Sequence, residues 1–171
     1  MWKTLSKKVV HKNNWYQSTH KEFEMPNKKK GDYFVLETNG ASMIIPIIDD
    51  KIIFVKQYRY TINRWSIELP SGGIKRGSTP LKTAKEELLE ETGYIAKKLK
   101  KIGVITTEPG FTSEICSIYI AKDLNFVGLN PEKTEEIKTL AIKIKDLRKM
   151  IMSGKILHSL TIASLIKVRL I

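Results

Sequence analysis

Four glutamates gather between residues 86 and 91, and their spacing suits the binding of a metal ion. Glu87, Glu90 and Glu91 are three and four residues apart, so on a helix they are neighbours on one face. Like charges at this spacing destabilise an isolated helix by about 0.2–0.5 kcal/mol per pair, and negative charge is unfavourable near a helix C-terminus. A divalent cation would turn that cost into a gain, and carboxylates are typical ligands of Mg²⁺ and Mn²⁺. The alternative is a solvated acidic face that pairs with nearby lysines.

A helix over Pro80–Thr92 would position these carboxylates. Thr79 is a suitable N-cap, and proline is favoured at the first helical position. Gly93 suits the left-handed residue that ends many helices. Apolar residues recur at helical spacing and predict one buried face: Leu81, Ala84 and Leu88.

Most of the remaining chain predicts strands. Apolar runs between turn residues indicate strands at Lys8–His11, Tyr16–Glu24, Tyr33–Thr38, Ala41–Ile48, Lys51–Tyr60, Trp65–Leu69, Lys98–Thr106, Glu114–Leu124 and Ile137–Lys143. Ser71–Gly73 is expected to begin a loop that runs to Thr79, because glycine weakens a strand. Two more helices are expected at Lys145–Ser153 and His158–Leu170. Helices among many strands predict an α+β domain whose sheet faces are covered by helices.

The composition excludes several classes of protein. The chain has 171 residues, of which 42% are hydrophobic, enough to bury a core in one domain. The only cysteine, Cys116, excludes an intramolecular disulfide and a cysteine-built zinc site. No apolar run approaches the roughly 18 residues that span a bilayer, and the first residues lack the apolar core of a signal peptide. A cytoplasmic protein without a membrane partner is therefore expected.

The charge is the unusual bulk feature. There are 30 Lys and Arg residues against 18 Asp and Glu, a formal charge of +12. Such an excess suggests an anionic partner, which could be nucleic acid, a membrane surface or a phosphorylated small molecule. However, 25 of the basic residues are lysines scattered along the chain, whereas arginine is preferred for bidentate recognition of phosphates and bases. We therefore interpret most of the lysines as solvated surface.

The segment around the glutamates resembles a known signature. Gly72–Tyr94 reads GGIKRGSTPLKTAKEELLEETGY and is similar to the Nudix box, the loop-helix signature of Nudix hydrolases. The positions that match its pattern are Gly72, Glu87, Leu88, Glu90, Glu91, Gly93 and Tyr94. Two positions depart from it, since Ser78 stands where the family has a glutamate and Glu86 stands where it has an arginine.

The flanking segments resemble the ADP-ribose pyrophosphatase branch of that family. Val55–Tyr60 is similar to the strand before the box, and Glu68–Gly72 to the Glu-Leu-Pro-Ala-Gly entry into it. Glu108–Glu114 is similar to the branch's Pro-Gly-Phe-x-x-Glu segment. The resemblance implies a Nudix-type α/β/α sandwich of mixed sheet with flanking helices. It also implies an N-terminal antiparallel β segment at 1–40, followed by the hydrolase domain at 41–171.

The same resemblance implies a reaction and a cofactor. Nudix hydrolases attack a phosphoanhydride with water, assisted by Mg²⁺ or Mn²⁺. Glu87 and Glu91 would be the principal metal ligands, with Glu90 in support and the Ser71 carbonyl as a further ligand. The catalytic base often comes from a later acidic loop, which suggests Glu135 or Glu136 without a choice between them.

Three more residues are candidates for binding the substrate. Arg59 suits a diphosphate, because its guanidinium fork matches phosphate oxygens. Trp15 is a candidate for stacking on a base, as N-terminal aromatics do in dimeric members of the branch, although packing within a core or homodimer is an equal alternative. Glu114 is expected to be a polar residue of the site. It could equally form a structural salt bridge, as could Glu68.

Three hypotheses about function follow. The first is an enzyme that hydrolyses ADP-ribose or a related nucleoside diphosphate sugar, of reduced activity because Ser78 and Glu86 replace the family's paired residues. The second is a catalytically impaired Nudix-fold protein that binds nucleotide. The third, a basic nucleic-acid-binding protein, is the weakest because no nucleic-acid motif is present.

Overall fold

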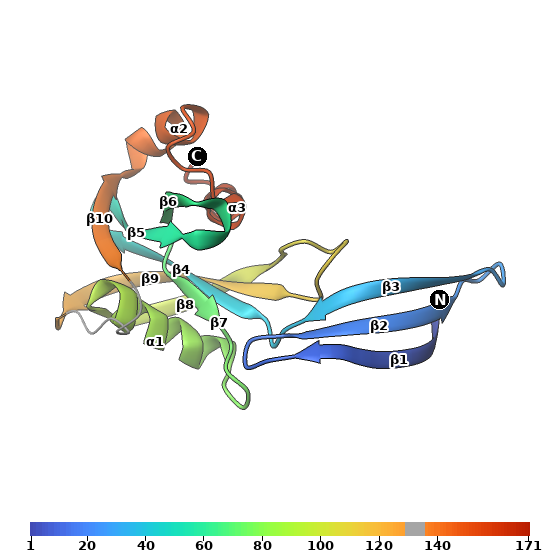
Figure 1. Ribbon diagram of the computed structural model, residues 1–171. Helices are drawn as coiled ribbons and strands as arrows, with labels where there is room; N and C mark the ends of the chain where they lie inside the picture. Colours follow the sequence, from blue (N-terminus) through green and yellow to red (C-terminus); the bar gives the residue numbers. More distant parts are fainter. Residues whose placement is uncertain (129–135) are drawn as a thin grey trace.

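Two β-sheets form the frame of the computed structural model, which describes residues 1–128 and 136–171 (Figure 1). The smaller sheet is antiparallel, with the strand order β1-β2-β3. Its strands are β1 (Lys3–Lys12), β2 (Gln17–Glu24) and β3 (Lys30–Glu37). This sheet projects from the rest of the molecule (Figure 1), and every residue of β1 is exposed. The predicted N-terminal antiparallel segment is confirmed, with a longer first strand than expected.

The larger sheet has seven strands in a mixed arrangement. Its strands are β4 (Ala41–Ile48), β5 (Lys51–Arg59), β6 (Arg64–Glu68), β7 (Ser71–Gly73), β8 (Tyr94–Thr106), β9 (Ile115–Phe126) and β10 (Ile137–Lys143). The central order is β10-β5-β4-β9-β8, while β6 pairs with β5 and β7 pairs with β4. The β4–β9 pair is parallel and the others described are antiparallel.

Three helices flank this larger sheet. They are α1 (Pro80–Thr92), α2 (Ile144–Met152) and α3 (Ser159–Lys167), and a short 3₁₀ turn, η1 (Tyr60–Ile62), joins β5 to β6. The bounds of α1 are as predicted. The Thr79 side chain accepts a hydrogen bond from the Lys82 N–H at 3.2 Å, and Gly93 ends the helix with φ of 73°. At that φ a side chain would be strained, so glycine is required there.

Helices cover both faces of the larger sheet. Successive residues of β4 point to opposite faces, so its side chains join a different buried cluster on each side. The buried cluster on one side includes Met43, Ile45, Phe54, Leu147 of α2 and Leu165 of α3. The cluster on the other side consists of Ile44, Ala84 and Leu88 of α1, Tyr119 and Ala121. Figure 1 shows α1 on one side of the sheet and α2 with α3 on the other. The predicted α/β/α sandwich is confirmed.

One sequence-based expectation was wrong. Ser71–Gly73 does not begin a loop but forms β7, whose Gly72 pairs with Ser42 of β4 in antiparallel register. Glycine lowers strand propensity, yet here the pairing with β4 supplies main-chain partners, and the lack of a side chain at Gly72 leaves room for Glu87. The loop begins only after Gly73.

The N-terminal sheet is fastened to the body through the loop before β9. The Leu36 N–H donates to the Phe111 carbonyl, and the Ser113 N–H donates back to the Leu36 carbonyl, both at 3.0 Å. The Tyr33 hydroxyl also donates to the Gly110 carbonyl at 2.9 Å. The segment similar to the family's Pro-Gly-Phe motif thus joins the two sheets.

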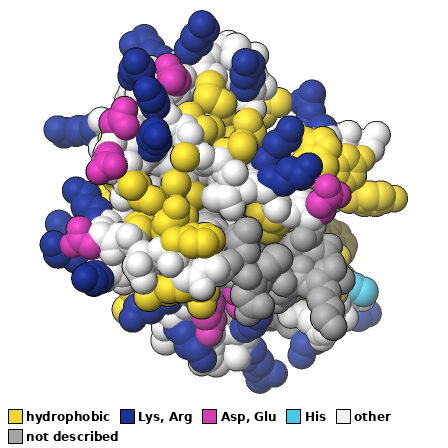
Figure 2. All heavy atoms as spheres, turned by 90° about the vertical axis from the view of Figure 1, so that its left-hand side faces the viewer, with side chains coloured by type: hydrophobic (Ala, Val, Ile, Leu, Met, Phe, Trp, Pro, Cys, Tyr) yellow, Lys and Arg dark blue, Asp and Glu magenta, His cyan; other side chains and the backbone are white. Residues whose placement is uncertain are grey.

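The surface agrees with the interpretation of the charge as dispersed. Figure 2 shows Lys and Arg side chains spread over the visible face, with Asp and Glu among them, and no single basic patch. Within the two described ranges, no helix is long and apolar enough to cross a membrane.

Candidate functional site

One cavity of about 650 Å³ collects most of the predicted site residues. It lies where the small sheet, β5, β7 and α1 meet. Its lining includes seven residues named from the sequence: Trp15, Arg59, Ser71, Glu87, Glu90, Glu91 and Glu114. Residues far apart in the chain therefore converge as the resemblance implies.

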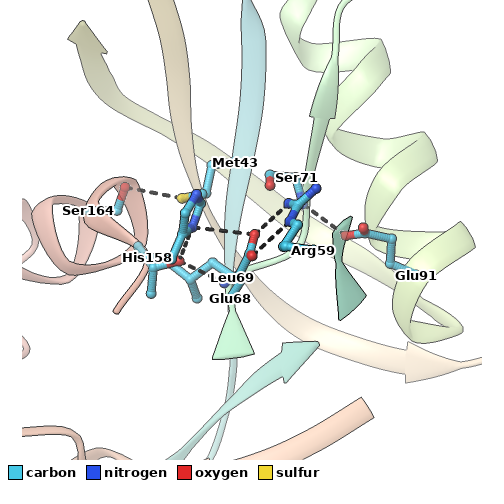
Figure 3. Close-up of polar contacts among 9 residues, drawn as sticks. Met43, Arg59, Glu68, Leu69, Ser71, Glu91, His158 and Ser164 are labelled. Carbon is cyan, nitrogen blue, oxygen red and sulfur yellow. Dashed lines mark hydrogen bonds and ion pairs between the residues drawn. The ribbon is translucent and has the colours of Figure 1, made fainter. Parts of the chain in front are cut away.

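Helix α1 presents its carboxylates to this cavity. Glu91 is buried, with 5% of its surface exposed, whereas Glu87 and Glu90 are partly exposed. The Glu91 carboxylate accepts a hydrogen bond from the Ser71 N–H at 2.9 Å (Figure 3). This bond fixes the helix against β7 and places a carboxylate beside the residue whose carbonyl is a candidate ligand.

The absence of a side chain at Gly72 leaves space for the carboxylate of Glu87. A side-chain carbon at Gly72 would overlap the carboxylate of Glu87, coming within 2.7 Å even of its farther oxygen. The position of the Glu87 carboxylate against β7 therefore depends on the absence of a side chain at Gly72. The first glycine of the box-like segment thus has a steric role in placing a candidate ligand.

Arg59 is held by a buried carboxylate. Its Nε and Nη2 groups donate to the two oxygens of Glu68 at 2.8 and 2.5 Å. The Glu68 side chain is 1% exposed and that of Arg59 is 41% exposed. Burial is the largest single influence and raises the pKa of Glu68, but the hydrogen bonds and charge of Arg59, together with contributions from His158 and Ser66, outweigh it and the pKa is lowered. A fixed guanidinium at the edge of a cavity is suited to a diphosphate.

Behind Glu68 lies His158, which precedes α3. Its Nδ1 is 3.5 Å from Glu68 Oε2 and 3.0 Å from the Thr161 hydroxyl, as Figure 3 shows for the labelled residues His158, Glu68 and Arg59. Burial lowers the pKa of His158, and the charge of Arg59 adds to this, while Glu68 opposes it. The imidazole is therefore neutral at neutral pH.

The N-terminal sheet contributes the turn between β1 and β2 to the cavity. Trp15 lies in this turn and is 78% exposed, so it is not a core residue of the chain. The Asn13 side chain accepts hydrogen bonds from the Trp15 and Tyr16 N–H groups, both at 2.9 Å, which fixes the turn. Glu114 also lines the cavity and accepts from the Thr38 hydroxyl at 3.4 Å.

Only one of the two candidate bases belongs to the described part of the chain, and it does not line the cavity. Glu135 lies outside the described residues. Glu136 is exposed, lies 4.0 Å from the Lys138 ammonium in an ion pair, and is not part of the cavity lining.

The two departures from the box lie beside the cavity rather than in it. Glu86 forms an ion pair with Lys82 one turn earlier, at 3.7 Å. The Ser78 hydroxyl lies 3.4 Å from that of Thr83. Neither residue is part of the cavity lining, so the negative charge of Glu86 is directed toward a lysine.

The donor set suits a hard cation. Three carboxylates and a main-chain carbonyl offer oxygen ligands only, which Mg²⁺ and Mn²⁺ prefer. As the side chains lie, no three His, Cys, Asp or Glu residues of the described ranges are grouped closely enough to enclose an ion. The fit therefore rests on donor type and on the shared cavity.

Sequence reasoning missed several lining residues. Gln57 lies two residues before Arg59 on β5 and lines the same cavity, as strand alternation predicts. Lys75, in the loop after β7, also lines it, and its place inside the box-like segment was an available signal. His158 is not part of the lining but contacts Glu68, and no local signal predicted that contact, because the two residues are brought together only by tertiary packing.

Comparison with known proteins places the chain in a family. Residues 38–157 match the NUDIX domain. The chain is 32% identical over 162 residues to the ADP-ribose pyrophosphatase of Bacillus subtilis (strain 168), spanning 93% of this chain and 88% of that protein. It is 30% identical over 172 residues to the ADP-ribose pyrophosphatase of Mycobacterium tuberculosis (strain ATCC 25618 / H37Rv), spanning 98% and 83%.

A solved structure gives the same result for the fold. The crystal structure of an ADP compounds hydrolase superposes with a TM-score of 0.86, covering 98% of this chain and 92% of that chain at 22% identity. This structural similarity shows the fold, whereas the similarity to the sequence relatives shows the family. The chain therefore belongs to the Nudix hydrolase family, in the part of it that resembles the ADP-ribose pyrophosphatases.

Proposed function

We propose that this protein hydrolyses the pyrophosphate bond of ADP-ribose or a related nucleoside diphosphate sugar, with Mg²⁺ or Mn²⁺ as cofactor. The observation that carries the proposal is the convergence of three carboxylates, Arg59 and Trp15 on one cavity of about 650 Å³. Cavities of this size hold small-molecule ligands. The relatives named ADP-ribose pyrophosphatase supply the substrate class.

The carboxylates of α1 are assigned to the metal. Glu87, Glu91 and the Ser71 carbonyl hold it, with Glu90 in support. A bound divalent cation neutralises the diphosphate and lowers the pKa of a bound water. The chain's own contribution is to hold these oxygens in place, which the hydrogen bond from Ser71 does for Glu91.

Arg59, Trp15 and Glu114 are assigned to the substrate. Arg59 binds the diphosphate, with its orientation set by Glu68. Trp15 stacks on the base from an exposed turn, a contact worth about 1–3 kcal/mol in single-strand binders. Glu114 contributes an acceptor in the cavity lining.

Glu135 and Glu136 remain the candidates for the catalytic base. Both belong to the segment before β10, a strand that pairs with β5, which ends at the cavity residue Arg59. The single variants Glu135→Gln and Glu136→Gln distinguish them, because only loss of the base lowers kcat while substrate affinity is kept.

A second function, nucleotide binding with impaired hydrolysis, is favoured by two observations. Ser78 and Glu86 replace two residues of the family's box, and the carboxylates of the described ranges are not grouped around one ion. In that case Arg59 and Trp15 would still bind a nucleotide.

A substrate panel separates the two functions. The protein is incubated with ADP-ribose, ADP-sugars and UDP-sugars, with Mg²⁺, with Mn²⁺ or with EDTA, and products are identified by mass spectrometry. Binding of the same compounds is measured by calorimetry. Metal-dependent turnover supports the enzyme, and binding without turnover supports the second function. The absence of both turnover and binding refutes both functions.

We further propose that residues 1–40 mediate a homodimer, beside a hydrolase domain at 41–171. The β1 edge is exposed along its length and carries exposed apolar side chains, among them Val9 and Val10. Such an edge invites pairing with another chain. Val9→Lys with Val10→Lys is expected to convert a dimer to a monomer in light scattering, and a wild-type monomer would refute the proposal. A cytoplasmic location remains a prediction from the sequence.

A further inference from the structure

We infer that His158 is a positioning residue for Arg59, acting through the Glu68 carboxylate, so that the start of α3 takes part in the substrate site. The inference rests on the proposed function in one respect, namely that Arg59 binds the substrate diphosphate. It adds a residue outside the box-like segment, from the far end of the chain, to the residues that set substrate affinity.

The first step is the pair nearest the cavity. Arg59 lies at the end of β5 and Glu68 at the end of β6, strands that are paired side by side. Two parallel hydrogen bonds, at 2.8 and 2.5 Å, fix the plane of the guanidinium. The orientation of the Glu68 carboxylate therefore helps to set the direction in which Arg59 faces the cavity.

The second step is the contact behind that carboxylate. His158 Nδ1 lies 3.5 Å from Glu68 Oε2, the same oxygen that accepts from Arg59 Nη2. Glu68 is almost fully buried, so its orientation is set by protein groups and not by water. His158 contacts the carboxylate from the side of α3 (Figure 3).

The third step fixes the imidazole. The Thr161 hydroxyl is 3.0 Å from His158 Nδ1 and accepts a hydrogen bond from the Leu69 N–H at 3.0 Å. Thr161 is fully buried. Nδ1 faces both the Glu68 carboxylate and the Thr161 hydroxyl, and this hydroxyl already accepts a hydrogen bond. The favoured tautomer therefore carries its proton on Nδ1. Nδ1–H then points toward Glu68 and Thr161 together.

The charged groups that face His158 are Glu68 from β6 and Arg59 from β5. Burial, assisted by Arg59, lowers the pKa of His158. The contact is therefore made by a neutral imidazole near pH 7. Protonation at lower pH adds a second cation on the same carboxylate, in competition with Arg59.

The test measures binding without turnover. Calorimetry gives the Kd of ADP-ribose in EDTA for the wild type, His158→Ala, His158→Asn, Arg59→Ala and the double variant His158→Ala/Arg59→Ala. Ser164→Ala is the matched control, because Ser164 is also buried on α3 but bonds to Met43 at 3.3 Å instead of Glu68. The Tm of every variant is recorded.

We expect His158→Ala to raise the Kd about five- to tenfold, the scale of one ordinary hydrogen bond. His158→Asn should stay within about twofold of the wild type, since its amide reproduces the Nδ1–H donor. In the double variant the loss should not exceed that of Arg59→Ala alone, because the two residues act in series. Ser164→Ala should lower Tm and leave Kd unchanged.

Other results overturn the inference in distinguishable ways. If His158→Ala lowers Tm but not affinity, or adds fully to Arg59→Ala, His158 is only structural. Failure of His158→Asn to restore affinity would also count against it. A wild type that binds none of the nucleoside diphosphate sugars overturns the proposed function and this inference with it.

Discussion

Glu91 of α1 accepts a hydrogen bond from the main-chain N–H of Ser71 in β7 at 2.9 Å. The bond spans 20 residues of sequence and closes the strand, loop and helix of the box-like segment into one unit. Because Glu91 is buried, its carboxylate has few other orientations. The proposed metal ligands are thereby held near the carbonyl of the residue that donates the bond.

Gly72→Ala is expected to displace Glu87, because the added carbon would overlap its carboxylate. The obstructed atoms are the end of a flexible side chain, so unfolding free energy should change little. Activity should fall by about 100-fold, the scale of a 1 Å misplacement. Gly73→Ala is the matched control, since nothing lies within 4 Å of its added carbon. Equal losses in kcat for the two variants would contradict the explanation.

Restoring the family's residues, Ser78→Glu with Glu86→Arg, should raise kcat/KM. Groups that orient a metal ligand are worth about 10- to 100-fold, so an increase of about tenfold is expected with Mg²⁺. Each single change should give less, since the two residues act as a pair in the family. Steady-state kinetics decide the question, and an unchanged or lower rate in the double variant would show that the departures are not limiting.

Trp15→Ala should weaken the binding of ADP-ribose by about 1–3 kcal/mol if its ring stacks on the base. Trp15→Phe should retain most of the affinity, since it keeps an aromatic face. Trp2→Ala is the control, because Trp2 is also exposed but packs at a tilt against Phe23, outside the cavity lining. The Kd is measured by calorimetry, and equal effects at the two tryptophans would argue against stacking.

Acidification should destabilise the protein in two stages. The folded-state pKa of His158 is lowered from 6.5, mainly by burial, so its contribution is complete above pH 6.5 and is lost as pH falls through the folded value. The pKa of Glu68 is lowered from 4.5, and its contribution is lost in the same direction at lower pH. Urea unfolding from pH 7.5 to 4 should show the free energy of unfolding fall as the pH is lowered. The slope between pH 7 and the folded pKa of His158 should shrink in His158→Asn, and an unchanged slope would refute the assignment.

Local signals were enough to predict α1. Thr79, Pro80 and Gly93 encode its ends, and the apolar spacing encodes its buried face, so its bounds were predicted correctly. The wrong prediction for Ser71–Gly73 has a tertiary cause. The glycines gave no strand signal, and β7 exists because β4 supplies partners and Glu87 needs the space.

The candidate site was predictable where the residues belong to short motifs. Glu87, Glu90, Glu91 and Ser71 lie within or beside the box-like segment, and their place in one cavity agrees with expectation. Glu136 was one of two candidates that the resemblance suggested in the later acidic loop, and it is not part of the cavity lining. His158 could not be predicted, because its contact with Glu68 depends on the packing of α3 after about 90 intervening residues.

The central claim is that the carboxylates of α1 support metal-dependent hydrolysis of ADP-ribose. The most direct measurement is the release of AMP and ribose 5-phosphate by the wild type, Glu87→Gln and Glu91→Gln, each with Mg²⁺ and with EDTA. We predict turnover by the wild type with Mg²⁺, none with EDTA, and a loss of kcat of at least about 100-fold in both variants. Wild-type turnover that persists in EDTA, or that equals the turnover of the two variants, would contradict the claim.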